Sequence, residues 1–145
     1  MQYSFRFFVS WIVAAVLMYG AFYFWHGIFL NDLNRITFSK VLFLFLAALV
    51  YLIISYVLYR TFETKILVNL ITAPLLRGAV SGILLGLVLF SIITVLGISF
   101  TKHISMKYLV ADCAWQVAEQ LVGGIIIGIG KSVLYEPKPE DLRHA

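Results

Sequence analysis

The sequence has 145 residues, of which 62% are hydrophobic and only 12% are charged, and its formal net charge is +4. A soluble domain is typically about one quarter charged, so this composition excludes an ordinary soluble fold. The basic residues occur singly near the ends of apolar runs, where they can meet lipid headgroups, and this spacing argues against nucleic-acid binding. The lone cysteine, Cys113, excludes an intrachain disulfide.

Four long apolar segments account for most of the chain. Each is long enough to cross a hydrocarbon core of ~30 Å as an α-helix, and together they comprise residues 7–30, 41–60, 78–101 and 108–130. The sequence therefore predicts an all-α integral membrane protein, an up-and-down four-helix bundle, with the lipid bilayer as its main partner. We expect one transmembrane domain over residues 1–131 and a short tail over residues 132–145.

The first segment follows Arg6, as the apolar region of a secretory signal would. Its length exceeds the ~7–15 apolar residues of such a signal, so we expect it to be retained as an anchor. Between the second and third segments, residues 66–71 precede Pro74 and are compatible with a short interfacial helix or an irregular loop. In the tail, Pro137 and Pro139 are incompatible with a regular helix.

The distribution of Lys and Arg predicts the orientation. One side of the membrane would carry the larger set, Arg6, Arg60, Lys65, Arg77, Lys131, Lys138 and Arg143. The other side would carry the smaller set, Arg35, Lys40, Lys102 and Lys107. Because basic residues are enriched on the cytoplasmic side, we expect both termini in the cytoplasm.

Glycines recur at helical spacing in the last two segments. Residues four apart share a helix face, and small residues there allow a close approach of another helix. The candidate packing residues are Gly78, Gly82, Gly86, Gly123, Gly124 and Gly128. This pattern is compatible with packing inside the bundle, and also with docking of a second copy or of a larger membrane complex.

The fourth segment carries a polar stripe. At ~100° per residue, Trp115, Gln116, Glu119 and Gly123 fall on the same side of the helix as Asp112. Glu119 is the middle residue of the segment, so it should lie near the bilayer centre, where an acid costs at least ~2.5 kcal/mol. We therefore expect Glu119 to face the protein interior, either as a functional group or as a protonated structural one.

Residues on the other helices can meet this stripe. Tyr19, Tyr23 and His26 share an arc of the first segment, and His26 is expected at a depth similar to that of Asp112. The predicted polar cavity is lined by Tyr19, Tyr23, His26, Tyr51, Asp112, Trp115, Gln116 and Glu119. Several members have a plainer interpretation: His26 as an interface residue, Trp115 as packing, and Asp112 as a headgroup-level group.

The same residues do not predict a metal, a cofactor or a catalytic triad. His26, Asp112 and Glu119 lack the spacing of a metal site. A haem between helices would need two axial ligands, and His103 is expected in a loop. A serine nucleophile with His and acid partners cannot be assigned.

The run Lys107-Tyr108-Leu109-Val110-Ala111-Asp112-Cys113-Ala114-Trp115-Gln116, followed by Gly123-Gly124, resembles a known pattern. It is similar to the final helix of small bacterial four-helix membrane proteins in families of unknown function, where an aspartate precedes an alanine–tryptophan pair. The specific likeness covers about a dozen residues, and Glu119 and Gln116 are not part of the pattern. The resemblance implies the fold and a bacterial inner-membrane location, and it implies no activity.

Three functional classes are compatible with these features. The first is a small non-enzymatic membrane protein, either an accessory subunit or a binder of a lipid or other small ligand in the cavity. The second is a proton-coupled transporter or channel module that uses Glu119, and the third is a lipid-modifying enzyme with His26 and Asp112 as a general acid/base pair. We favour the first class.

Overall fold

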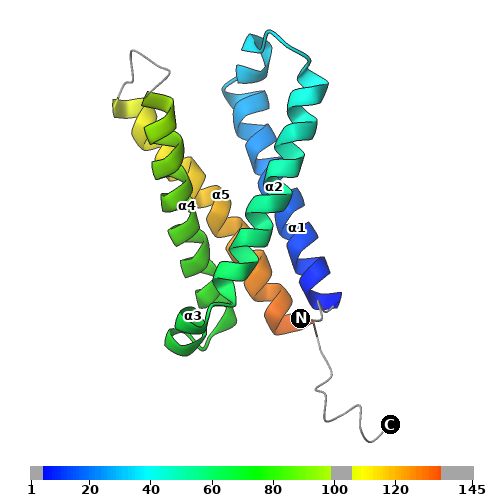
Figure 1. Ribbon diagram of the computed structural model, residues 1–145, viewed down its shortest axis with the longest axis vertical. Helices are drawn as coiled ribbons and strands as arrows, with labels where there is room; N and C mark the ends of the chain where they lie inside the picture. The colour runs from blue at the N-terminus through cyan, green and yellow to red at the C-terminus, as the bar shows by residue number, and fades with distance from the viewer. Residues whose placement is uncertain (1–4, 99–105, 135–145) are drawn as a thin grey trace, which may run out of the picture.

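The computed structural model describes residues 5–98 and 106–134, and in this part every regular element is a helix (Figure 1). In chain order the elements are α1 (Phe5–Phe22), the π-helical segment η1 (Tyr23–Phe29), the 3-10 turn η2 (Asp32–Arg35), α2 (Lys40–Phe62), α3 (Lys65–Leu70), α4 (Pro74–Ile98) and α5 (Met106–Val133). We refer below to the η2 end and to the α3 end of the molecule. The predictions for His103 and for residues 135–145 of the tail lie outside the described residues.

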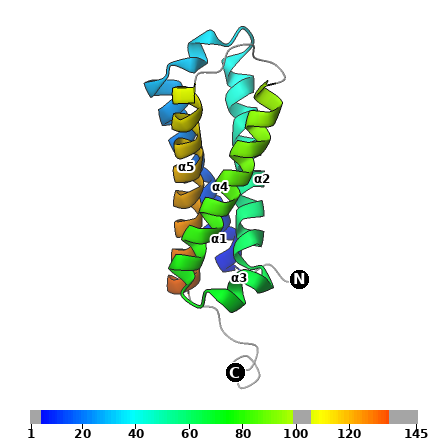
Figure 2. The same cartoon turned by 90° about the vertical axis from the view of Figure 1, so that its left-hand side faces the viewer.

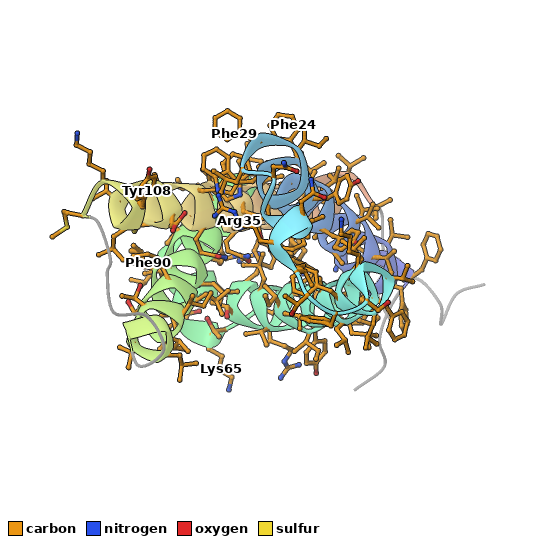
Figure 3. All side chains as sticks on the ribbon, turned by 90° about the horizontal axis from the view of Figure 1, so that it is seen from above. Phe24, Phe29, Arg35, Lys65, Phe90 and Tyr108 are labelled. Atoms are coloured by element: carbon orange, nitrogen blue, oxygen red, sulfur yellow. The ribbon has the colours of Figure 1, made fainter. Side chains whose placement is uncertain are left out.

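Four of these helices are long and apolar enough to cross a membrane, which confirms the prediction of four spans in an integral membrane protein. They are Phe5–Phe29, Lys40–Phe62, Pro74–Leu96 and Met106–Val133. Large apolar side chains cover their outer surface, as a lipid solvent requires. Figure 3 shows Phe24 and Phe29 projecting away from the other helices.

The helices extend beyond the charge-free runs of the sequence. Ser39 accepts a hydrogen bond from the Leu42 N–H at 3.4 Å and thereby caps the start of α2. The fourth span, α5, continues to Val133, and α4 begins at Pro74, which suits the first helical position because it has no N–H to leave unpaired. The segment that could have been a loop is helical as α3, and it buries Leu67.

The end of the first span is wound as a π-helix. The Leu30 N–H donates to the Trp25 carbonyl at 2.8 Å, an i to i+5 bond in place of the α-helical one. A wider turn rotates the chain by fewer degrees per residue, so faces extrapolated from α1 no longer hold over η1. Asn31 then adopts a left-handed conformation (φ 56°) and ends the span.

Helix α5 is packed between α4 and α1 through its glycines. Gly124 lies against the backbone of Gly78, and a Cβ on Gly128 would be 2.7 Å from the Pro74 carbonyl oxygen. On another face, Gly123 contacts the Met18 side chain of α1. These close contacts lie in the half of the molecule nearer the α3 end, so they hold the helices together there (Figure 2).

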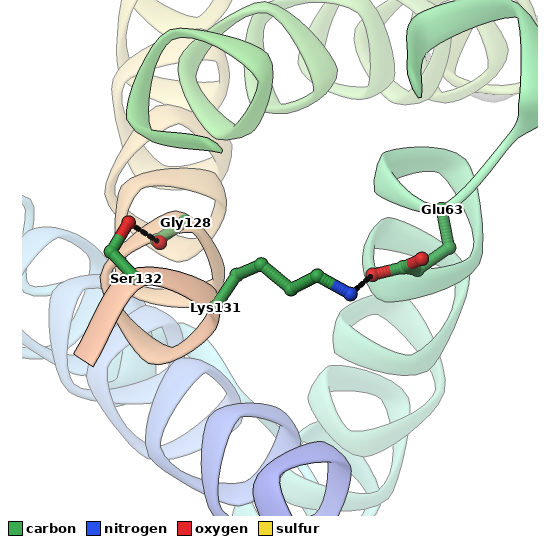
Figure 4. Close-up of polar contacts among 4 residues, drawn as sticks. All are labelled: Glu63, Gly128, Lys131 and Ser132. Carbon is green, nitrogen blue, oxygen red and sulfur yellow. Dashed lines mark hydrogen bonds and ion pairs between the residues drawn. The ribbon is translucent and has the colours of Figure 1, made fainter. Parts of the chain in front are cut away.

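The pair α1–α2 and the pair α4–α5 separate toward the η2 end (Figure 1). At the α3 end they are joined by polar contacts as well as by glycines. Lys131 of α5 forms an ion pair of 2.9 Å with Glu63, which follows α2 (Figure 4). Arg77 is only 5% exposed, and its guanidinium carbon lies 4.3 Å from the ring centroid of the buried Phe62.

Candidate functional site

Glu119 is buried inside the bundle. It lies in the middle of α5 and is 3% exposed. The Tyr51 hydroxyl of α2 donates a hydrogen bond to its carboxyl group. The Gln120 amide donates at 3.4 Å. The Trp115 indole N–H also faces the carboxyl, in a geometry short of a full hydrogen bond. Glu119 therefore faces the protein, and its neighbours are neutral hydrogen-bond donors.

Gln120 is a buried polar residue that the sequence reasoning missed. It is fully buried, and its Oε1 atom has no hydrogen-bond partner. A Cβ on Gly82 would collide with the backbone carbonyl of Gln120, so Gln120 lies at the contact between α5 and α4. The sequence spacing could have identified it, because Gln120 follows Gln116 by four residues and therefore shares its side of the helix.

Aromatic rings surround this polar group. Tyr51 packs against Phe22 and Tyr19 of α1, with ring centroids 5.5 Å and 6.1 Å apart. The Tyr19 hydroxyl donates to the Leu44 carbonyl at 3.3 Å, so it is directed toward α2 and away from Glu119. On the other side, Trp115 stacks on Trp25 of η1 at 4.4 Å.

A pocket of about 340 Å³ lies between α2 and α4, in the half nearer the η2 end. Its walls are apolar except for two polar residues, and it is lined by Phe22, Phe43, Leu46, Ala47, Val50, Tyr51, Ile54, Leu89, Ile93 and Gln116. Leu46, Val50 and Ile93 are each about half exposed, so the pocket is open to the side of the bundle. Tyr51 joins the pocket to Glu119, because its ring lines the pocket and its hydroxyl bonds to the carboxyl.

The predicted cavity residues therefore separate into two groups. Tyr51, Trp115, Gln116 and Glu119 converge around the pocket and the buried acid. The others lie farther out: Tyr19 touches the Tyr51 ring, His26 packs on Phe22 at 5.2 Å, and both Tyr23 and Asp112 are exposed. Tyr23 is the first residue of η1 and is 44% exposed, so it lies on the outer surface and does not line the pocket.

The glycines of α4 face α5. Gly78 meets Gly124, Gly82 meets Gln120, and a Cβ on Gly86 would lie 2.8 Å from the Val117 Cα. The groove that these residues form is filled by α5 of the same chain. A second copy or another subunit would therefore have to use a different surface.

Metal-ligating residues do not gather at this site. Within residues 5–98 and 106–134, no three His, Cys, Asp or Glu side chains are close enough to hold a metal ion. Comparisons with protein-family models, with curated proteins and with solved structures find no match for this chain. The pocket and the buried acid beside it are therefore the features that indicate a function.

Proposed function

We propose that this chain is a small non-enzymatic protein of the bacterial inner membrane that binds an apolar or amphipathic ligand between α2 and α4. In this proposal the four spans form an up-and-down bundle with both termini in the cytoplasm. The cluster of Arg60, Lys65, Arg77 and Lys131 at the α3 end supports this orientation.

The observation that carries the proposal is the pocket. Its volume of about 340 Å³ falls within the range of ~300–1,000 Å³ that is usual for small-molecule sites. Apolar walls with a few polar groups are also typical of such sites. The exposed rim residues Leu46 and Val50 give access from the side, so a ligand dissolved in the acyl chains can enter without crossing water.

The separation of the helix pairs explains why the pocket exists. Glycine contacts hold α4 on α5 up to Gly86, and beyond this point α4 carries Leu89 and Ile93 toward α2. The space between α2 and α4 at this level is the pocket, which is available to a ligand or to lipid. A well-packed interior would otherwise leave few voids of this size.

A neutral fluorescent probe, phenylnaphthylamine, tests the proposal with protein in nanodiscs. We expect saturable binding above that of protein-free nanodiscs, and loss of this binding in Ala47→Phe, which fills the pocket from α2. Leu49→Phe is the matched control, because Leu49 is on the same helix, is 42% exposed and does not line the pocket. Equal binding to both variants would contradict the proposal.

The buried acid favours one second candidate, a proton-coupled transport module in which Glu119 exchanges a proton. Its basis is the burial of Glu119 and the hydrogen bond from Tyr51. Proteoliposomes with a pH gradient separate the two functions. A transport module would acidify or alkalinise the lumen and would lose this activity in Glu119→Gln, whereas a binding protein would show no proton flux in either form.

A further inference from the structure

We propose that the ligand of the α2–α4 pocket is a lipophilic organic monocation, such as a quaternary ammonium or phosphonium compound. The inference rests on the proposed binding function and adds the charge and chemical class of the ligand. It follows from three features of the site: an acid without a basic partner, aromatic rings on the pocket wall, and a tyrosine that connects them.

Within residues 5–98 and 106–134, no Lys or Arg side chain is among the groups that contact the acid. Its contacts are Tyr51, Trp115 and Gln120, which are all neutral. The Lys and Arg residues in the described part of the chain lie in turns or within the first or last few residues of a helix: Arg6, Arg35, Lys40, Arg60, Lys65, Arg77, Lys107 and Lys131. A carboxylate in this position would therefore carry a negative charge near the centre of the membrane with no basic side chain to balance it. A cation stabilises a negative charge most strongly in such a low-dielectric environment.

The pocket wall suits a large cation. Phe22, Phe43 and Tyr51 all line it, and an aromatic face attracts an organic cation within ~6 Å of its centroid, most strongly when water is absent. Aliphatic residues supply the rest of the wall and favour an apolar body over a hydrated ion. A small metal ion would find too few ligands, since no group of three ligating side chains occurs in the described residues.

Tyr51 transmits the charge of Glu119 into the pocket. Its hydroxyl donates to the carboxyl while its ring forms part of the wall. A phenol that donates to an anion becomes more electron-rich, so its ring attracts a cation more strongly than an isolated tyrosine does. The carboxyl itself is shielded from the pocket, which suits a bulky cation that is held by the ring and by a nearby charge.

The test compares two ions of the same shape and opposite charge, tetraphenylphosphonium and tetraphenylborate, on protein in nanodiscs of neutral lipid. We expect saturable binding of the phosphonium and none of the borate to the wild-type protein. Glu119→Gln should weaken phosphonium binding by about tenfold, which corresponds to ~1.4 kcal/mol. Tyr51→Phe keeps the ring and removes the hydroxyl, so it should weaken phosphonium binding less than Glu119→Gln does.

The outcomes separate this inference from the proposed function. Phenylnaphthylamine binding that is lost in Ala47→Phe, together with equal affinity for the two ions, would leave a neutral-ligand pocket and overturn the cation inference. Absence of binding for all three probes would overturn both. The comparison of the two ions is made on the wild-type protein, so it holds even where Glu119→Gln fails to fold.

Discussion

The indole rings of Trp25 and Trp115 lie almost parallel, with centroids 4.4 Å apart and 10° between their planes. Trp25 belongs to η1 and Trp115 to α5, so the stack joins the first and last spans at the half nearer the η2 end. The stack closes the side between the first span and α5, whereas the open pocket lies between α2 and α4. The asymmetry places the pocket opening on the α2–α4 side of the bundle.

Two stacked indoles couple electronically, and this provides a first prediction. We expect the far-ultraviolet circular dichroism of the wild-type protein to contain an exciton couplet from the two indoles, because the rings are close and have a fixed orientation. Trp25→Phe should remove the couplet and destabilise the protein by about 0.5–1.5 kcal/mol beyond the loss of buried area. Trp11→Phe, a change in the third tryptophan, should leave the couplet intact.

The glycine contact between α4 and α5 gives a second prediction. Gly124→Ala would place a methyl group against the backbone of Gly78, which cannot move aside as a side chain can. We expect a loss of about 1–3 kcal/mol in the free energy of unfolding, measured by steric trapping in bicelles. Gly20→Ala is the control, because nothing lies within 4 Å of its added Cβ, and its effect should stay within about 0.5 kcal/mol. Equal effects of the two substitutions would contradict the packing.

A double-mutant cycle measures the contact between Tyr51 and Glu119. We expect a coupling free energy of about 1 kcal/mol between Tyr51→Phe and Glu119→Gln, which is usual for hydrogen bonds between membrane helices. In the comparison cycle Tyr56→Phe replaces Tyr51→Phe, since Tyr56 packs on Phe7 and Trp11 of α1. That second cycle should give no coupling larger than about 0.5 kcal/mol. No coupling in the first cycle would show that the two groups do not meet.

The ion pair between Glu63 and Lys131 should contribute little. Its side chains are 32% and 28% exposed, so water screens the attraction across 2.9 Å. We expect Lys131→Met to cost at most about 1 kcal/mol of unfolding free energy, and the cost to fall as salt is added. The exchanged pair, Glu63→Lys with Lys131→Glu, should recover most of the loss. A much larger cost would mean that Lys131 has a role beyond this pair.

The spans could be predicted from the sequence because a membrane helix must be apolar over a fixed length, and this property is visible residue by residue. The inward direction of Glu119 could be predicted for the same reason, since an acid in hydrocarbon is costly. The contact between Gly78 and Gly124 could not be predicted in the same way. Glycine spacing indicated that a helix approaches closely, but not whether that helix belongs to this chain or to a partner.

The residues that could not be placed from the sequence have physical explanations. His26 lies inside η1, whose π-helical winding changes the angular spacing from which its helix face is predicted. Counting basic residues places Arg77 at the positive end, yet Arg77 is also buried against Phe62, a contact between the start of α4 and the end of α2. The pocket is a consequence of how two helix pairs separate, and a helical repeat carries no information about that separation.

The position of a bound ligand is the sharpest test of the pocket between α2 and α4. A neutral diazirine-bearing apolar ligand can be photoactivated on the wild-type protein in nanodiscs and its attachment sites mapped by peptide mass spectrometry. We predict labelling of pocket residues of α2 and α4, such as Ala47, Ile54 and Leu89, and competition by excess unlabelled ligand. Labelling spread evenly over outward-facing residues such as Leu49 and Ile53, without competition, would contradict a binding pocket between these helices.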